Sequence, residues 1–170
     1  EELLEKKEFV RDCQIDTDLE MLIPDDYVSS INERMNLYTN LNNIENEEGL
    51  EDFEKELKDR FGPVPVAVRE LFNAIRLKWM AKRPGVERII FKNDKVRCFF
   101  IENQESAFYQ SIQFGQILKF VQSHPENSKL KQTSSHLILI FEGVKRIHKA
   151  LNKLQQIDSF VCPEETESTA

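Results

Sequence analysis

The chain has 170 residues and a formal net charge of −7, from 23 basic and 30 acidic side chains. This excess of negative charge argues against nonspecific binding to nucleic acid, which depends on neutralising phosphates, and it favours basic partner surfaces. Hydrophobic residues make up 40% of the chain, including 12 Phe, which is enough for a buried core and predicts one folded domain.

The first predicted elements lie between Phe9 and Leu41. Short apolar groups alternate with acids up to Ile23, which indicates one or two extended segments before Pro24. Asp25 or Asp26 can then cap a helix. Its apolar stripe is expected at steps of three and four residues, at Val28, Ile31, Met35, Tyr38 and Leu41.

Two further helices are predicted around a sharp break. One runs from about 47 to 61 and buries Leu50, Phe53 and Leu57. Gly62 can adopt the left-handed conformation that ends a helix, and Pro63 prevents the helix from continuing. The next helix runs from about 65 to 82, with its buried face formed by Val68, Leu71, Phe72, Ile75 and Trp79.

The second half has a different period. Its expected elements are strands 86–91 and 95–101 joined by a turn at Asn93-Asp94, a helix over 106–123 interrupted near Gly115, strands 130–133 and 136–141, and a last helix with the stripe Val144, Ile147, Leu151 and Leu154. The apolar run from Leu137 to Phe141 is typical of a central strand buried on both faces. The predicted fold class is α+β, an N-terminal three-helix segment followed by a small, mostly antiparallel sheet packed with helices.

No pattern in the chain predicts catalysis, a cofactor or a metal. The five glycines are isolated, so the sequence contains no phosphate-binding loop. His124, His136 and His148 are too far apart for a zinc pattern and are interpreted as turn and surface residues. Cys98, on an expected strand, is interpreted as a buried structural thiol.

The cysteine count and the hydropathy indicate the compartment. Cys13, Cys98 and Cys162 are odd in number and widely separated, which fits a reducing cytoplasm. No apolar run approaches the roughly 20 residues that span a bilayer, and the charged start is unlike a secretory signal. Because the sequence begins at Glu1 without Met, it is expected to be a fragment of a longer chain.

An acidic helical face is the most specific candidate for binding. Glu48, Asp52, Glu56 and Asp59 recur at steps of four, four and three residues, so they share one face of the second helix. Partners at i+4 are available within the helix for Glu51, Glu54 and Glu56, namely Lys55, Lys58 and Arg60. Asp59 has only Lys55, in the less favourable order, and opposes the helix dipole. Such a charge suits an external basic partner, although a solvated charged face remains the alternative.

Three motifs carry a resemblance to a known family. They are Ile23-Pro24-Asp25-Asp26-Tyr27, Glu33-Arg34-Met35-Asn36-Leu37-Tyr38, and Asp59-Arg60-Phe61-Gly62-Pro63. Over roughly 15 to 156 the chain resembles the C-terminal domain of bacterial transcription-repair coupling factors, the Mfd family. The resemblance implies a domain over 15–157 after a weakly matching lead-in or linker over 1–14. The tail over 158–170 is acidic and polar and is expected to be disordered.

The resemblance also implies a function. In this family a helicase-type motor displaces RNA polymerase stalled at DNA damage, and a module near the N-terminus recruits UvrA for nucleotide excision repair. The C-terminal domain is similar to a clamp that packs on that module and hides its UvrA-binding face. By position, Glu56 and Asp59 would face arginines of the module, and Arg60, Phe61, Gly62 and Pro63 would complete the interdomain contact.

The resemblance thus implies a noncatalytic, autoinhibitory domain. The expected direct partner is the N-terminal module of the same protein, with UvrA and stalled RNA polymerase reached indirectly, and with no direct nucleic acid, no membrane and a monomeric state. Two alternatives stay open at this point. One is a freestanding acidic adaptor that binds a basic partner protein. The other is a small hydrolase with paired carboxylates, which would need a deep pocket lined by two close acids.

Overall fold

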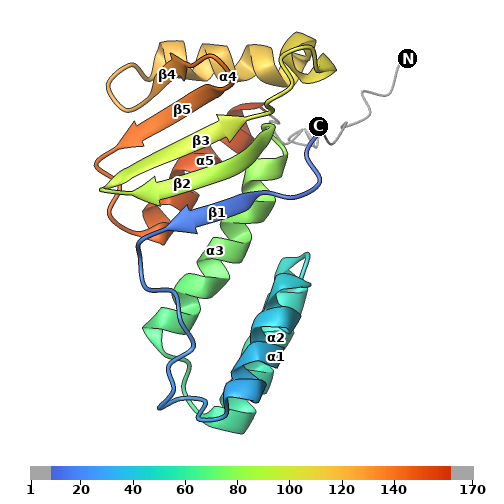
Figure 1. The fold of residues 1–170 in the computed structure, drawn as a ribbon, viewed down its shortest axis with the longest axis vertical. Coiled ribbons are helices and arrows are strands. Elements are labelled where there is room, and N and C mark those ends of the chain that lie inside the picture. The colour runs from blue at the N-terminus through green and yellow to red at the C-terminus, as the bar shows by residue number, and fades with distance from the viewer. Residues whose placement is uncertain (1–8, 162–170) are drawn as a thin grey trace, which may run out of the picture.

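A computed structural model describes residues 9–161 and has the predicted α+β architecture. The fold has two parts: a helical hairpin of α1 and α2, and a sheet with its own packed helices. The hairpin lies below the sheet, and α3 extends from one part to the other (Figure 1). In chain order the elements are β1 (Gln14–Thr17), α1 (Ile31–Asn42), α2 (Glu47–Phe61), α3 (Val66–Lys82), β2 (Val86–Lys92), β3 (Lys95–Phe100), the 3-10 helix η1 (Ala107–Gln110), α4 (Ile112–Ser123), β4 (Lys129–Gln132), β5 (Leu137–Glu142) and α5 (Ile147–Val161).

The sheet has five strands in the order β1-β2-β3-β5-β4. Only β1 and β2 pair in parallel, and the other neighbours are antiparallel, as predicted. The turn between β2 and β3 has positive φ at Asn93 (54°) and Asp94 (59°), which is the geometry of a two-residue hairpin turn. The apolar run of β5 is internal but not central, because β3 is the middle strand of the sheet.

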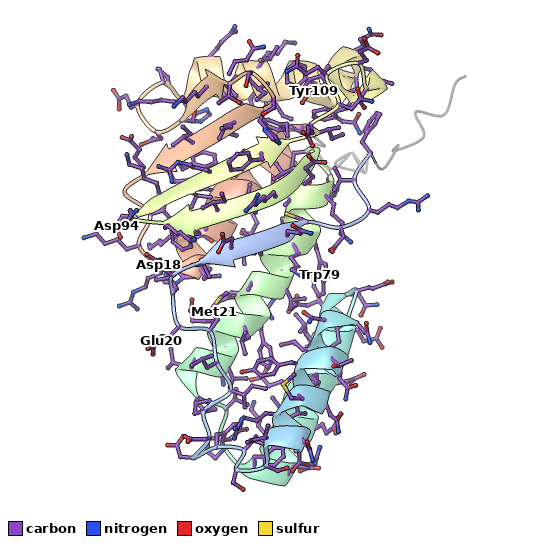
Figure 2. The ribbon with its side chains drawn as sticks, in the orientation of Figure 1. Asp18, Glu20, Met21, Trp79, Asp94 and Tyr109 are labelled. Atoms are coloured by element: carbon purple, nitrogen blue, oxygen red, sulfur yellow. The ribbon has the colours of Figure 1, made fainter. Side chains whose placement is uncertain are left out.

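Helix α3 belongs to two cores. Its first half, including Val68 and Phe72, packs with buried residues of α1 and α2, whereas Leu77 and Ala81 pack against the sheet and α5. Trp79 marks the transition between the two (Figure 2). Its indole Nε1 donates a hydrogen bond to the carbonyl of Ile44, 3.2 Å away in the connection between α1 and α2. A single helix therefore fastens the helical hairpin to the sheet.

The helix predicted from Asp25 or Asp26 starts later than expected. Pro24 initiates one isolated turn, in which the amides of Tyr27 and Val28 donate to its carbonyl. The chain then extends to Ser30, whose side chain caps α1 by accepting from the amide of Glu33. The buried face also differs from the expected stripe, because Leu37 and Leu41 are buried while Ile31 and Met35 are 68% and 59% exposed.

Two other local predictions were wrong. The break expected at Gly115 lies at Ser111, whose side chain accepts from the amide of Phe114 and starts α4 after η1. The tail expected to be disordered from 158 is helical as far as Val161, since α5 continues there. Asp158 is buried and pairs with Arg83 at 3.1 Å, which ties this last turn to the end of α3. Residues 162–170, including Cys162, lie outside the described residues, as do 1–8.

No helix within residues 9–161 combines the length and the apolar character needed to cross a membrane.

Candidate functional site

The three sequence motifs meet in one place, at the end of the helical hairpin. The backbone amide of Ile23 donates to the hydroxyl of Tyr38 on α1, at 2.7 Å. The hydroxyl of Tyr27 lies 2.9 Å from the carbonyl of Gly62 and 3.3 Å from that of Leu57, so it is shared between the two acceptors. Segments that are up to 35 residues apart in sequence are thus joined by tyrosine hydroxyls.

Charged groups strengthen the same junction. Arg60, near the end of α2, pairs with Glu33 of α1 and also with Glu56 one turn earlier, at 3.3 Å. Arg34 donates from Nη1 to the carbonyl of Val28 at 2.6 Å, which holds the approach to α1. The motifs that carried the resemblance are therefore mutually bonded, and each fixes the position of another.

The Phe61-Gly62-Pro63 joint has a conformation that depends on its sequence. Gly62 adopts φ 88° and ψ −162°, a region essentially restricted to glycine, and its amide caps α2 by donating to the carbonyl of Lys58. The Phe61 ring packs against Tyr27 at 5.7 Å between centroids, and the Arg60 guanidinium lies 4.8 Å above the Phe61 ring. These contacts make the joint a rigid support for the last turn of α2.

The acidic face of α2 is exposed on that support. Glu48, Asp52, Glu56 and Asp59 are all exposed, as the helical spacing predicts. Glu56 is engaged by Arg60, and the predicted pair of Glu54 with Lys58 is formed at 3.3 Å. Within the described part of the chain, the Asp59 side chain makes no hydrogen bond and no ion pair. Asp59 is thus an exposed carboxylate at the negative end of the helix dipole, where it is available to a basic group.

The Tyr27 hydroxyl offers a direct test of how the joint is held. Burial raises the pKa of Tyr27, so the hydroxyl stays protonated and able to donate. Tyr27→Phe keeps the ring against Phe61 but leaves the carbonyl of Gly62 without this donor. We expect the free energy of unfolding to fall by about 1 kcal/mol, measured from urea unfolding curves. An unchanged midpoint would mean that the ring alone holds the joint.

The buried cysteines do not form a reactive site. Cys13 and Cys98 are fully buried, and burial raises the pKa of Cys13 to about 12 and that of Cys98 further still. Neither thiol supplies a thiolate at neutral pH, so the prediction of a structural role for Cys98 is confirmed by its burial.

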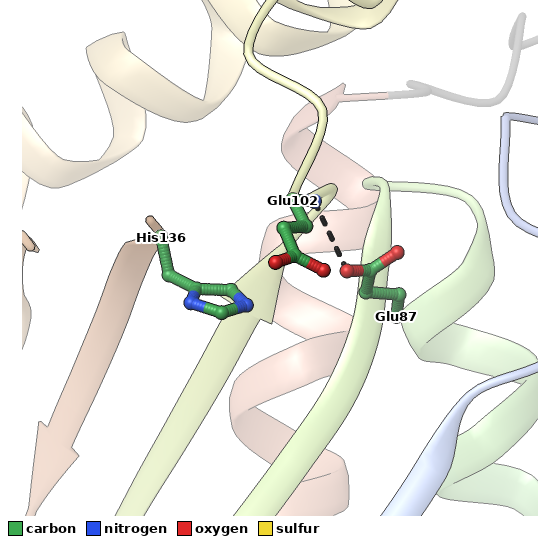
Figure 3. A group of neighbouring side chains, drawn as sticks. All are labelled: Glu87, Glu102 and His136. Atoms are coloured by element: carbon green, nitrogen blue, oxygen red, sulfur yellow. Dashed lines mark hydrogen bonds between the residues drawn. The ribbon is translucent and has the colours of Figure 1, made fainter. Parts of the chain in front are cut away.

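One group of side chains was missed by the sequence reasoning. Glu87, Glu102 and His136 bring their side-chain ligand atoms within 4.8 Å of one another, although no two of them are neighbours in sequence (Figure 3). No spacing rule could have found them, because they come together only through the pairing of β2, β3 and β5.

Comparison with known proteins gives a consistent result. The model of the TRCF domain family matches residues 17–111, more than half of the chain. The transcription-repair-coupling factor of Rickettsia prowazekii is 29% identical over 141 residues, which cover 82% of this chain and 12% of that protein. That of Escherichia coli is 33% identical over 78 residues, which cover 45% of this chain and 7% of that protein.

The fold has been seen before. A crystal structure of the C-terminal domain of transcription-repair coupling factor matches with a TM-score of 0.69 at 20% identity, covering 88% of this chain and 92% of that one. The chain spans about a tenth of the length of the curated relatives it matches. All three motifs that meet at the joint lie inside the matched residues.

Proposed function

This chain belongs to the TRCF domain family, and from that premise we propose that it is a noncatalytic docking domain. It packs on the N-terminal UvrA-binding module of a transcription-repair coupling factor, masks the UvrA-binding face of that module and so restrains the repair reaction until the motor meets stalled RNA polymerase. The observation that carries the proposal is the exposed acidic end of α2, with the unpaired Asp59 beside a rigid joint.

Charge alone is too weak for this task. Exposed ion pairs contribute about 0.2–1 kcal/mol each, whereas moving a two-state switch from mostly closed to mostly open requires about 5.5 kcal/mol. Close charge pairs inside a partly desolvated interface couple by about 1.5 kcal/mol or more. The acids must therefore be surrounded by apolar contact when the domain is docked.

The joint supplies such contact next to the acids. Pro63 is exposed, Val66 is 73% exposed at the start of α3, and Phe61 is only half-buried. Val64, between them, is buried in the core of the helical hairpin and holds this stretch in place. The neighbouring side chains can therefore be exposed while the core stays intact. The proposed docking surface accordingly consists of Glu56, Asp59, Phe61, Pro63 and Val66.

Titration of this chain against the separately produced N-terminal module tests the proposal. We expect saturable one-to-one binding in calorimetry that weakens as salt is raised, because the contact combines apolar burial with attraction between acids and arginines. UvrA added to the preformed complex should compete with this chain for the module. Absence of binding at low salt, with both partners folded, would refute the docking proposal.

We also expect poor binding to duplex DNA, despite a row of arginines along α3 and its C-cap. Arg69, Arg76 and Arg83 are spaced by seven residues but are occupied by Glu54, Glu47 and Asp158. The bond to Arg76 lowers the pKa of Glu47, so that partner stays ionised at neutral pH. Fluorescence anisotropy at physiological salt should give a dissociation constant no tighter than about 10 μM. A submicromolar value would contradict this expectation.

A further inference from the structure

Glu87, Glu102 and His136 come together at one end of the sheet, over the face opposite α3 and α5. Glu87 is in β2, Glu102 follows β3, and His136 precedes β5 (Figure 3). Their ligand atoms lie within 4.8 Å of one another, yet His136 makes no ion pair within 4.0 Å among the described residues. Ligands about 2.1 Å from a zinc ion are separated by roughly 3.4 to 4.2 Å, so this spacing needs only a small closure by Glu102, which is exposed, and by Glu87 and His136, which are half-buried.

An irregularity in β2 directs the Glu87 side chain toward Glu102 and His136. The register between β2 and β3 shifts between Val86 and Arg88, which leaves Glu87 as an extra residue in the strand. A β-bulge of this kind redirects a side chain that regular alternation would send to the other face. The backbone amide of Glu102 then donates to Glu87 Oε1 at 3.0 Å, which fixes the carboxylate against the end of β3.

His136 is held by its own turn. Its amide donates to Thr133 Oγ1 at 3.0 Å and its carbonyl accepts from the Thr133 amide at 2.8 Å. The ring packs edge to face on Phe99 at 5.5 Å, and Nδ1 lies 2.8 Å from Ser135 Oγ. In the tautomer in which Nδ1 donates to Ser135 Oγ, Nε2 is left as the ligand nitrogen, the arrangement commonly found at metal-binding histidines.

The charge of the surroundings favours a cation. The three side chains line a hollow of about 350 Å³ together with Asp12, Gln14, Arg88 and Phe99. Three carboxylates thus face one guanidinium, and Arg88 also lies 3.9 Å from Asp16 outside the hollow. Carboxylates gathered without enough positive charge repel one another, and a divalent ion would remove that repulsion.

We propose that Glu87, Glu102 and His136 form a binding site for a divalent transition-metal ion of the zinc class. One imidazole nitrogen and two carboxylate oxygens suit Zn²⁺ with a water at the fourth position. Mg²⁺ and Ca²⁺ prefer all-oxygen sites with six or more ligands and bind here more weakly. Because the site lies on a sheet whose core is complete without it, a chelator leaves the chain folded.

The test is calorimetric titration of ZnCl₂ into the 170-residue chain without any affinity tag, with Co²⁺ as a spectroscopic probe. We expect one ion per chain and a visible absorption band on Co²⁺ binding, with little response to Mg²⁺. His136→Ala and Glu102→Gln should each weaken Zn²⁺ binding by about tenfold or more. Circular dichroism checks that both variants are folded.

The matched controls are His148→Ala and Glu105→Gln, which remove the same groups outside the cluster and should leave Zn²⁺ affinity unchanged. A wild-type dissociation constant weaker than about 1 mM would overturn the proposal. Zn²⁺ affinity that survives in folded His136→Ala and Glu102→Gln would overturn it equally, since the ion would then bind elsewhere on the acidic surface.

Discussion

Reversing the charge of Glu56 and Asp59 together, as Glu56→Lys and Asp59→Lys, is expected to weaken docking on the N-terminal module by roughly a hundredfold, because two close charge pairs of about 1.5 kcal/mol each are lost. Like charges then face each other across the interface, and this adds a repulsive contribution. The measurement is the dissociation constant of the chain with the isolated module at one fixed salt concentration.

The same double change should leave folding almost untouched. Both side chains are exposed, and Asp59→Lys should change stability by less than about 0.5 kcal/mol. Glu56→Lys replaces the surface ion pair with Arg60 by two like charges, at a cost of about 0.4–1 kcal/mol. At Asp59 the sign is even expected to favour folding, because a lysine at the carboxyl end of α2 interacts well with the helix dipole where an aspartate does not. Asp59→Lys alone should therefore weaken docking while it slightly raises the free energy of unfolding. A general loss of structure would lower both.

A charge-matched control distinguishes the effect of the proposed docking surface from the effect of a changed net charge. Glu105→Lys with Glu126→Lys alters the total charge by the same amount at exposed positions away from the joint, and docking should be retained. In the full-length protein, the Glu56 and Asp59 reversal should raise UvrA binding in the absence of stalled polymerase. The hypothesis is falsified if UvrA binding stays at its resting level while the domain remains folded.

Helix α2 shows why some of the fold could be predicted from the sequence. Its apolar spacing and its end at Gly62 are local signals, and they agree on a helix over about 47 to 61, as the structure has it. The hairpin between β2 and β3 is local in the same sense, since Asn93-Asp94 favours the positive φ that the turn requires.

The misplaced start of α1 shows where local signals compete. Asp25, Asp26 and Ser30 are all good capping residues, and the sequence alone does not decide among them. The outcome depends on Tyr38 and Arg34, which bind the preceding segment in a conformation that delays the helix. The Arg34 bond spans six residues and is local, but the Tyr38 bond spans 15 residues and depends on how the segment before α1 packs on the helix.

The cluster of Glu87, Glu102 and His136 and the pairing of β1 with β2 could not be predicted from local sequence patterns. β1 pairs with β2 across the three intervening helices, and Glu87 reaches His136 only because β3 lies between their strands. For the proposed docking surface, the acidic face followed from helical spacing. The support beneath it, in which Tyr27 bonds to Gly62, did not.

Gly85 and Gly62 allow a comparison that isolates steric overlap from backbone strain. Both have positive φ, 85° and 88°, so alanine is strained at either position. A Cβ at Gly62 meets nothing within 4 Å, whereas a Cβ at Gly85 would lie 2.3 Å from Cε2 of Phe108. We expect Gly62→Ala to cost about 1–3 kcal/mol from strain alone, and Gly85→Ala to cost about 1–3 kcal/mol more through overpacking.

Phe108 cannot move aside to relieve that overlap, because it is fully buried and its ring contacts those of Phe9, Phe100 and Phe114 at 5.5 to 6.0 Å between centroids. Replacing Phe108 by the smaller leucine should relieve the overlap instead.

Gly85→Ala combined with Phe108→Leu is therefore expected to destabilise the chain by less than the sum of the two single changes. The expected coupling is about 0.5–3 kcal/mol in a double-mutant cycle measured by urea unfolding. Gly62→Ala with Phe108→Leu should be additive, since Phe108 lies in the core beneath the sheet while Gly62 adjoins Phe61 and Val64 of the other core. Additivity in the Gly85 cycle would show that backbone strain, and not the Phe108 ring, excludes a side chain at the end of α3.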